Sequence, residues 1–330
     1  MSIKRFILSS FLVISSLSVF SQEDFITFNA LVLPLIDPDS IAIAIPSTRI
    51  DAGILTNNAD HYFGGIKGDE RIRSYNVKGV WLSFFRKLSK STQIGVSLPS
   101  ITTDIDYIGQ YYANKEYHKT RFDELFIHLN YVERFSNSLV VGTFMTSVPF
   151  QGSQIPLLHP NQSVLYSGFW HLLLGGSYSQ KMSKNYWITV GSYLSWYIER
   201  SAILADGSWV DSIIGQEGSN IQTRWRPGPR VGFLGLISRK LNGYTVSAGY
   251  KYTWKDQDHF SSIQPEGYPE FNQLTADLSR DNQVSHTVVC SVYKTIYRFR
   301  IGLSLKFDVG GSAGGLYSRQ FALQLSHCSH

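Results

Sequence analysis

Residues 244–255 read YTVSAGYKYTWK, a run in which aromatic or aliphatic side chains alternate with small, polar or basic ones. Successive side chains of a β-strand point to opposite faces, so this run has one apolar and one polar face. Residues 297–307 (YRFRIGLSLKF) and 320–326 (QFALQLS) repeat the pattern. The longer runs exceed the ~5–6 residues usual for strands and match the ~9–11 residues with which a tilted strand crosses a bilayer. The alternation therefore predicts membrane-crossing strands.

Short, mostly basic turns join such runs in pairs. Their irregular spacing argues against a solenoid with a fixed period and favours consecutive hairpins. The segments between the hairpins are longer and rich in Gly, Asp, Asn and Pro, as in residues 257–281. Runs 74–86 and 230–239 alternate less regularly, which suggests bulges. The turns lie at residues 86–91, 134–138, 181–185, 239–243 and 294–296.

Five hairpins, one strand near residues 45–56 and one at 317–327 give about twelve strands, with a range of about 10–14. Lipid tolerates no unpaired backbone groups, and a closed barrel pairs all of them. We therefore expect an all-β fold: an antiparallel transmembrane β-barrel with short periplasmic turns and long extracellular loops. A secreted β-sandwich is the alternative, because its strands alternate in the same way.

Composition narrows the class of protein. The formal net charge of the 330 residues is +5, and charged residues make up 17%. This surplus is too small to suggest a nucleic-acid partner. Two cysteines exclude a disulfide scaffold and a cysteine-based zinc module.

The amino terminus has the order of a secretory signal. A basic start at Lys4 and Arg5 precedes an apolar stretch, and a small residue, Ser21, comes before Gln22. We expect residues 1–21 to be a cleaved signal peptide and residues 22–44 to form a periplasmic rim or plug segment. Residues 45–330 would form the barrel. The expected location is the outer membrane of a Gram-negative bacterium, where outer-membrane lipid surrounds the strands.

No motif points to catalysis. Residues 310–314 match G-x-S-x-G, but that nucleophile motif needs a following helix, and residues 316–325 have the pattern of a strand. Residues 159–163 contain His, Asn and Ser, the residue types of a membrane lipase triad, in a loop setting with Pro160. The histidines form no metal-binding pair on a helix. We expect no enzyme activity, no cofactor and no metal.

Polar residues on the alternating runs are candidates for the barrel interior. Glu124, His128 and Asn130 alternate with apolar residues and should point inward. The later strands should add the basic residues Lys251, Lys255, Arg298, Arg300 and Lys306. One interpretation is a basic wall that attracts anionic solutes or an acidic partner. The other, which we prefer, is internal pairing with carboxylates that closes a narrow barrel.

The two ends of the chain resemble a known family. Residues 22–24 (QED), the motif around Pro34, Asp37 and Pro38, and the closing runs after Arg298 are similar to the PorP/SprF-like outer-membrane components of type IX secretion in Bacteroidota. Members carry Asn-Pro-Leu followed by Asn-Pro-Ala, whereas this sequence has Leu33 before Pro34 and aspartates at positions 37 and 39. The resemblance implies a non-catalytic accessory component of a secretion or gliding machine, with other machine subunits as partners.

The Asp-Pro element and the hairpin series also resemble FadL-like and phenol-degradation-type transporters. That resemblance implies an amino-terminal plug, which would place residues 22–44 inside the barrel. Its function would be passive passage of small or hydrophobic solutes. The machine component is the main hypothesis, the channel is the alternative, and an outer-membrane enzyme is the third.

Overall fold

A computed structural model describes most of the chain as β-strand. Residues 1–21, the expected signal peptide, and residues 22–44, with Pro34, Asp37 and Pro38, lie outside the described residues, so both assignments stay predictions. No helix in the described part of the chain is long and apolar enough to span a membrane. The described residues are 45–62, 72–107, 116–121, 124–150, 170–204, 221–262, 282–311 and 316–329.

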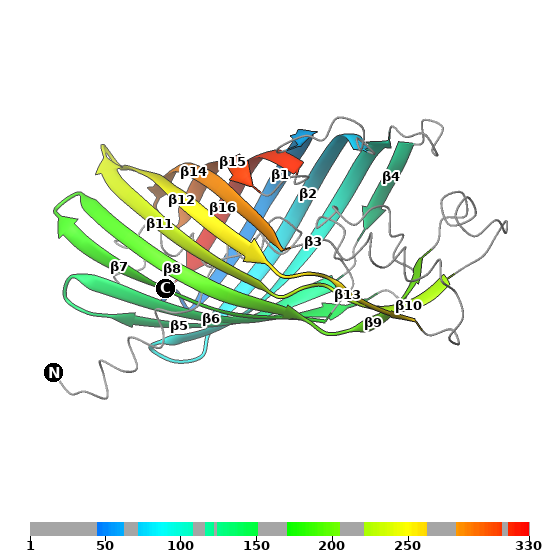
Figure 1. Cartoon of the computed structure of the whole chain (residues 1–330). Coiled ribbons are helices and arrows are strands. Elements are labelled where there is room, and N and C mark those ends of the chain that lie inside the picture. Colours follow the sequence, from blue (N-terminus) through cyan, green and yellow to red (C-terminus); the bar gives the residue numbers. More distant parts are fainter. Residues whose placement is uncertain are drawn as a thin grey trace.

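Twelve long antiparallel strands close into one barrel (Figure 1). Each pairs with the next along the chain, and β1 pairs with β16 to complete the ring. This confirms the predicted antiparallel barrel of about twelve strands. The strands are β1 (Thr48–Tyr62), β2 (Ile72–Lys87), β3 (Thr92–Tyr107), β5 (Glu124–Arg134), β6 (Ser138–Pro149), β7 (His171–Ser183), β8 (Tyr186–Tyr197), β11 (Arg230–Leu241), β12 (Tyr244–Lys255), β14 (Gln283–Ile296), β15 (Phe299–Gly311) and β16 (Leu316–Ser329).

Four shorter strands extend the barrel at one end. Strand β4 (Glu116–Arg121) pairs with the second half of β3, while β5 pairs with the first half. Strands β9 (Arg200–Leu204), β10 (Ile221–Arg226) and β13 (His259–Ser262) form a separate three-stranded sheet. Figure 1 shows this sheet projecting beyond the barrel strands.

The two ends of the barrel differ in their connections. Five short turns lie at one end, together with the start of β1 and the end of β16, where Thr48 pairs with Ser329. One of these is Asn242-Gly243, whose positive φ values of 48° and 82° suit a two-residue hairpin turn. We call this the turn end and the opposite one the loop end. In outer-membrane barrels, short turns face the periplasm.

The barrel is apolar outside, and most of its polar strand residues face the inside. On β16, Leu323 and Leu325 are exposed on the outer face, whereas Gln324 and Ser326 are buried on the inner face. The other barrel strands repeat this arrangement, with exposed residues such as Leu82 and Phe233 outside. Such a distribution is stable when hydrocarbon covers the outer face.

The expected bulge in residues 230–239 was wrong. Strand β11 keeps an unbroken register with both β8 and β12. Its apolar pattern is irregular because Leu234 and Leu236 are buried inside, while Phe233 and Ile237 are exposed outside. Residues 74–86 are also regular, with a register shift only at their edge, between residues 72 and 74.

Candidate functional site in the barrel interior

The interior contains most of the polar residues that the alternation singled out. Glu124, His128 and Asn130 lie on the inner face of β5 and are 1%, 0% and 3% exposed. The later strands place four predicted basic residues in the buried interior. These are Lys251 and Lys255 on β12 and Arg300 and Lys306 on β15.

Arg298 is a correction to the prediction. It is exposed in the two-residue turn between β14 and β15, beside Tyr297, whose φ is +54°. Strand β15 begins only at Phe299. The alternation in the sequence continues through the turn, so the strand predicted from it starts two residues too early.

An ion pair on β1 was not predicted. Arg49 Nε lies 3.0 Å from Asp51 Oδ2, and the Arg49 guanidinium lies 4.0 Å from the centre of the Phe85 ring on β2. All three side chains are buried on the inner face. The sequence contains a pattern that could have predicted this pair. Arg49 and Asp51 lie two residues apart on either side of the exposed Ile50, so both point to the inner face of the strand.

His128 belongs to a buried hydrogen-bond chain. Ser97 donates to Ser83 over 2.7 Å, and His128 Nε2 lies 2.8 Å from Ser97 Oγ. A hydroxyl has one proton, so His128 must donate to Ser97 rather than accept from it. His128 therefore cannot act as a base on Ser97 in this arrangement, and the contact fits a structural role.

A second histidine–serine pair lies near the loop end. His171 Nε2 is 2.7 Å from Ser195 Oγ, and the imidazole stacks on Tyr197 with ring centres 4.9 Å apart. The His171 backbone also donates to Ser147 Oγ over 3.0 Å. Both His171 and Ser195 are fully buried, so no substrate reaches the pair in this state. Within the described residues, no group of three His, Cys, Asp or Glu side chains could hold a metal ion.

Asp258 links the barrel to the projecting sheet. Its carboxylate lies 2.7 Å from Lys255 Nζ, accepts from the Gly228 backbone N–H over 2.8 Å and accepts from Trp225 Nε1 over 3.3 Å. Trp225 lies on β10, Gly228 lies in the Pro227–Pro229 break between β10 and β11, and Lys255 ends β12. The buried Asp258 carboxylate thus ties the end of β12 to β10 and to that break.

Apolar side chains gather in the middle of the interior, beside two buried lysines: Lys251 is the register partner of Leu234, and Lys306 is that of Val289. On β1, Leu55 follows the charged Arg49 and Asp51 toward the loop end; on β11, Leu234 and Leu236 follow Arg230 toward the turn end. These leucines belong to one connected cluster of buried side chains, here called the apolar waist. Its members are Leu55, Trp81, Phe126, Met145, Leu173, Tyr193, Leu234, Leu236, Val289, Tyr293 and Ala322.

Cations outnumber carboxylates among the buried residues that the structure describes. Six basic residues and four acidic ones are buried, so the formal charge of this described set is positive. The basic residues are Arg49, Arg230, Lys251, Lys255, Arg300 and Lys306, and the acidic ones are Asp51, Glu124, Asp258 and Asp308. One acidic contact is the 2.8 Å hydrogen bond that Asp308 accepts from Thr287.

Comparison with known proteins supports the fold. An outer-membrane channel from Pseudomonas putida F1 superposes with a TM-score of 0.60 at 11% identity, over 86% of this chain and 95% of that one. The β domain of the Bordetella autotransporter BrkA (TM-score 0.47, 7% identity, 86% and 99% coverage) and the Ralstonia pickettii toluene transporter TbuX (0.39, 9%, 87% and 91%) are less similar.

No family model and no curated protein matches the chain. The resemblance to type IX secretion components therefore gains no support from these comparisons. What they support is the fold: the chain is a closed, twelve-stranded antiparallel barrel of the outer-membrane kind.

Proposed function

We propose that this protein is a passive outer-membrane channel for small, largely apolar solutes. The apolar waist is the observation that carries the proposal. A hydrophobic constriction opposes the passage of water and hydrated ions, because hydration is lost there without replacement. Solutes with an apolar body lose less hydration free energy when they enter such a constriction.

The outer face supports the membrane location. Exposed apolar side chains cover it between Tyr186 near the turn end and Trp196 near the loop end of β8. Ten residues span about 33 Å along a strand and about 25 Å once a tilt of about 40° is included, which is the height of the apolar band of outer-membrane barrels.

The surplus of buried cations favours solutes with a negative charge. Arg49 and Arg300 lie toward the turn end, and Arg230 and Lys255 lie toward the loop end. Positive groups on both sides of the waist attract anions into the barrel. Small aromatic or aliphatic acids combine such a charge with an apolar body, so we take them as the substrate class.

Swelling of proteoliposomes tests the function. Mature protein reconstituted at known density should admit an aromatic carboxylate faster than a neutral sugar of similar size. Equal rates for both solutes would contradict selection by an apolar waist. Swelling no faster than in protein-free vesicles would contradict the channel itself.

Affinity purification from solubilised membranes separates the channel from the machine component that the end motifs suggested. A channel should be recovered alone, whereas a machine component should bring stoichiometric large subunits. Recovery of such subunits together with an absence of solute flux would favour the machine component.

A further inference from the structure

The turn end of the barrel is strongly basic. Among the described residues of its five hairpin turns and adjoining strand ends, Glu133 is the one carboxylate. Three of the cations lie over aromatic rings: Arg239 over Tyr186 at 5.0 Å, Lys294 over Tyr244 at 4.6 Å and Lys181 over Trp187 at 5.2 Å. The basic residues are Arg86, Lys87, Lys90, Arg134, Lys181, Lys184, Arg239, Lys240, Lys294 and Arg298.

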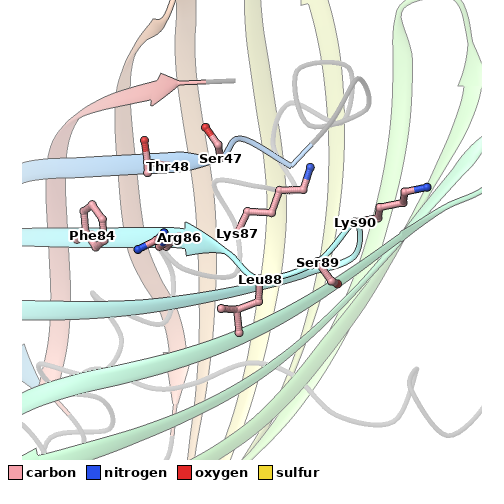
Figure 2. Close-up of a pocket in the computed structure, with 8 residues that line it drawn as sticks. All are labelled: Ser47, Thr48, Phe84, Arg86, Lys87, Leu88, Ser89 and Lys90. Atoms are coloured by element: carbon pink, nitrogen blue, oxygen red, sulfur yellow. The ribbon is translucent and has the colours of Figure 1, made fainter.

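Three of these cations line one pocket, here called the rim pocket (Figure 2). It lies where the start of β1 meets the β2–β3 turn, and its volume is about 600 Å³. Figure 2 shows the cations spread along the end of β2 and the turn, with Phe84 and Leu88 beside them. The lining residues are Ser47, Thr48, Phe84, Arg86, Lys87, Leu88, Ser89 and Lys90.

Hydrogen bonds hold the walls of the rim pocket in place. The Lys87 backbone donates to the Ser47 carbonyl over 3.0 Å, which joins the two sides. Within the turn, the Leu88 N–H donates to the Thr92 carbonyl over 2.9 Å, and the Ser91 N–H donates to Ser89 Oγ over 3.2 Å. These bonds fix the backbone positions from which the lining side chains extend.

The rim pocket is charged on one side and apolar on the other. Among the described residues, Arg86, Lys87 and Lys90 have no carboxylate at ion-pair distance. Phe84 and Leu88 are 44% and 59% exposed. Phe84 continues the row of outward side chains formed by Val80 and Leu82 on β2, so the apolar side is continuous with the outer face of the barrel.

We propose that the rim pocket binds the phosphate headgroup of an anionic phospholipid in the periplasm-facing leaflet, with an acyl chain along Phe84 and the outer face of β2. Three cations and the hydroxyls of Ser47, Thr48 and Ser89 suit phosphate oxygens. Continuity with the apolar face favours a lipid over free phosphate. This inference rests on the membrane placement in the proposed function but not on solute passage.

Native mass spectrometry of the detergent-purified mature protein tests the proposal. Phosphatidylglycerol and phosphatidylcholine with identical acyl chains are titrated separately, and inorganic phosphate at millimolar concentration is the competitor. We expect tighter binding of phosphatidylglycerol and little displacement by phosphate. Equal binding of the two lipids, or full displacement by phosphate, would overturn a site for an anionic lipid.

Variants locate the site. Lys87→Gln with Lys90→Gln should weaken phosphatidylglycerol binding about 30-fold, since each basic residue near a membrane surface contributes ~1 kcal/mol. The matched control, Arg134→Gln with Lys184→Gln, removes two exposed cations from other turns and should change binding less than about threefold. Equal losses in the two variants would assign binding to the basic turn end in general and overturn the rim pocket. The gel mobility of unheated samples checks that both variants fold. If the protein passed no solutes, the channel function would be contradicted, but the result of the lipid-binding experiment would still stand.

Discussion

The indole ring of Trp81 on β2 lies over the backbone of Gly53 on β1, in the space that a side chain at position 53 would occupy. A Cβ added to Gly53 would lie 1.8 Å from Cη2 of Trp81, closer than non-bonded atoms approach. The two residues are register partners, and Trp81 belongs to the apolar waist. Glycine at position 53 therefore determines where the largest ring of the waist can lie.

Gly53→Ala should force the Trp81 ring to move and destabilise the barrel by about 1–3 kcal/mol, the usual cost of overpacking a filled interior. The midpoint of urea unfolding in detergent, followed by tryptophan fluorescence, measures the loss. Gly235→Ala is the matched control, because a Cβ at position 235 meets nothing within 4 Å. Equal midpoints for the two variants would show that the contact does not constrain Trp81.

The outer face of β16 can be tested with a charge. Leu323 is exposed there and pairs with Ile54 and Leu303 on the neighbouring strands. If lipid covers this face, Leu323→Arg should lower the folding stability of the barrel by about 2–4 kcal/mol. The folded form should then lose heat resistance on gels of unboiled samples.

Tyr297→Arg is the control for that charge. Tyr297 lies in the β14–β15 turn and is 97% exposed, so an arginine there should leave heat resistance unchanged. A barrel that tolerates arginine at both positions would not have hydrocarbon against β16.

Asp258→Asn should loosen the projecting sheet of β9, β10 and β13. The substitution removes the carboxylate 2.7 Å from the buried Lys255 ammonium, and breaking a buried pair typically costs about 3–5 kcal/mol. Limited proteolysis of the intact, reconstituted protein should then cut faster near residues 226–229 and 256–258. Asp256→Asn is the control, since that half-buried carboxylate accepts only a local bond from the Gln257 N–H. Identical cleavage in the two variants would refute the linking role of Asp258.

The strands could be predicted from the sequence because the outer face of each strand needs apolar side chains where it contacts lipid. In residues 244–255, every second side chain must tolerate hydrocarbon, and this leaves a visible period of two. The same period located Glu124, His128 and Asn130, since a polar residue between outward apolar ones has only the interior left.

The apolar waist could not be predicted in this way. Leu234 and Leu236 point inward while Phe233 and Ile237 point outward, and the four residues look alike in the sequence. The Asp258 contacts were equally hidden, because Trp225 and Gly228 are about thirty residues away along the chain. Contacts between distant strands depend on closure of the barrel, and no local period records them.

Enlarging the apolar waist tests whether it controls the passage of solutes. Met145 and Leu173 are register partners on β6 and β7, and both are fully buried in the waist. Their outward neighbours Phe144 and Leu174 are also register partners and are exposed on the outer face. Met145→Ala with Leu173→Ala is therefore compared with Phe144→Ala with Leu174→Ala in proteoliposome swelling, at equal amounts of folded protein. We expect the inward pair to raise the rate for an aromatic carboxylate severalfold and to let a sugar of similar size enter, while the outward pair should match the unmodified protein. Unchanged rates for the inward pair would contradict the claim that the waist controls passage.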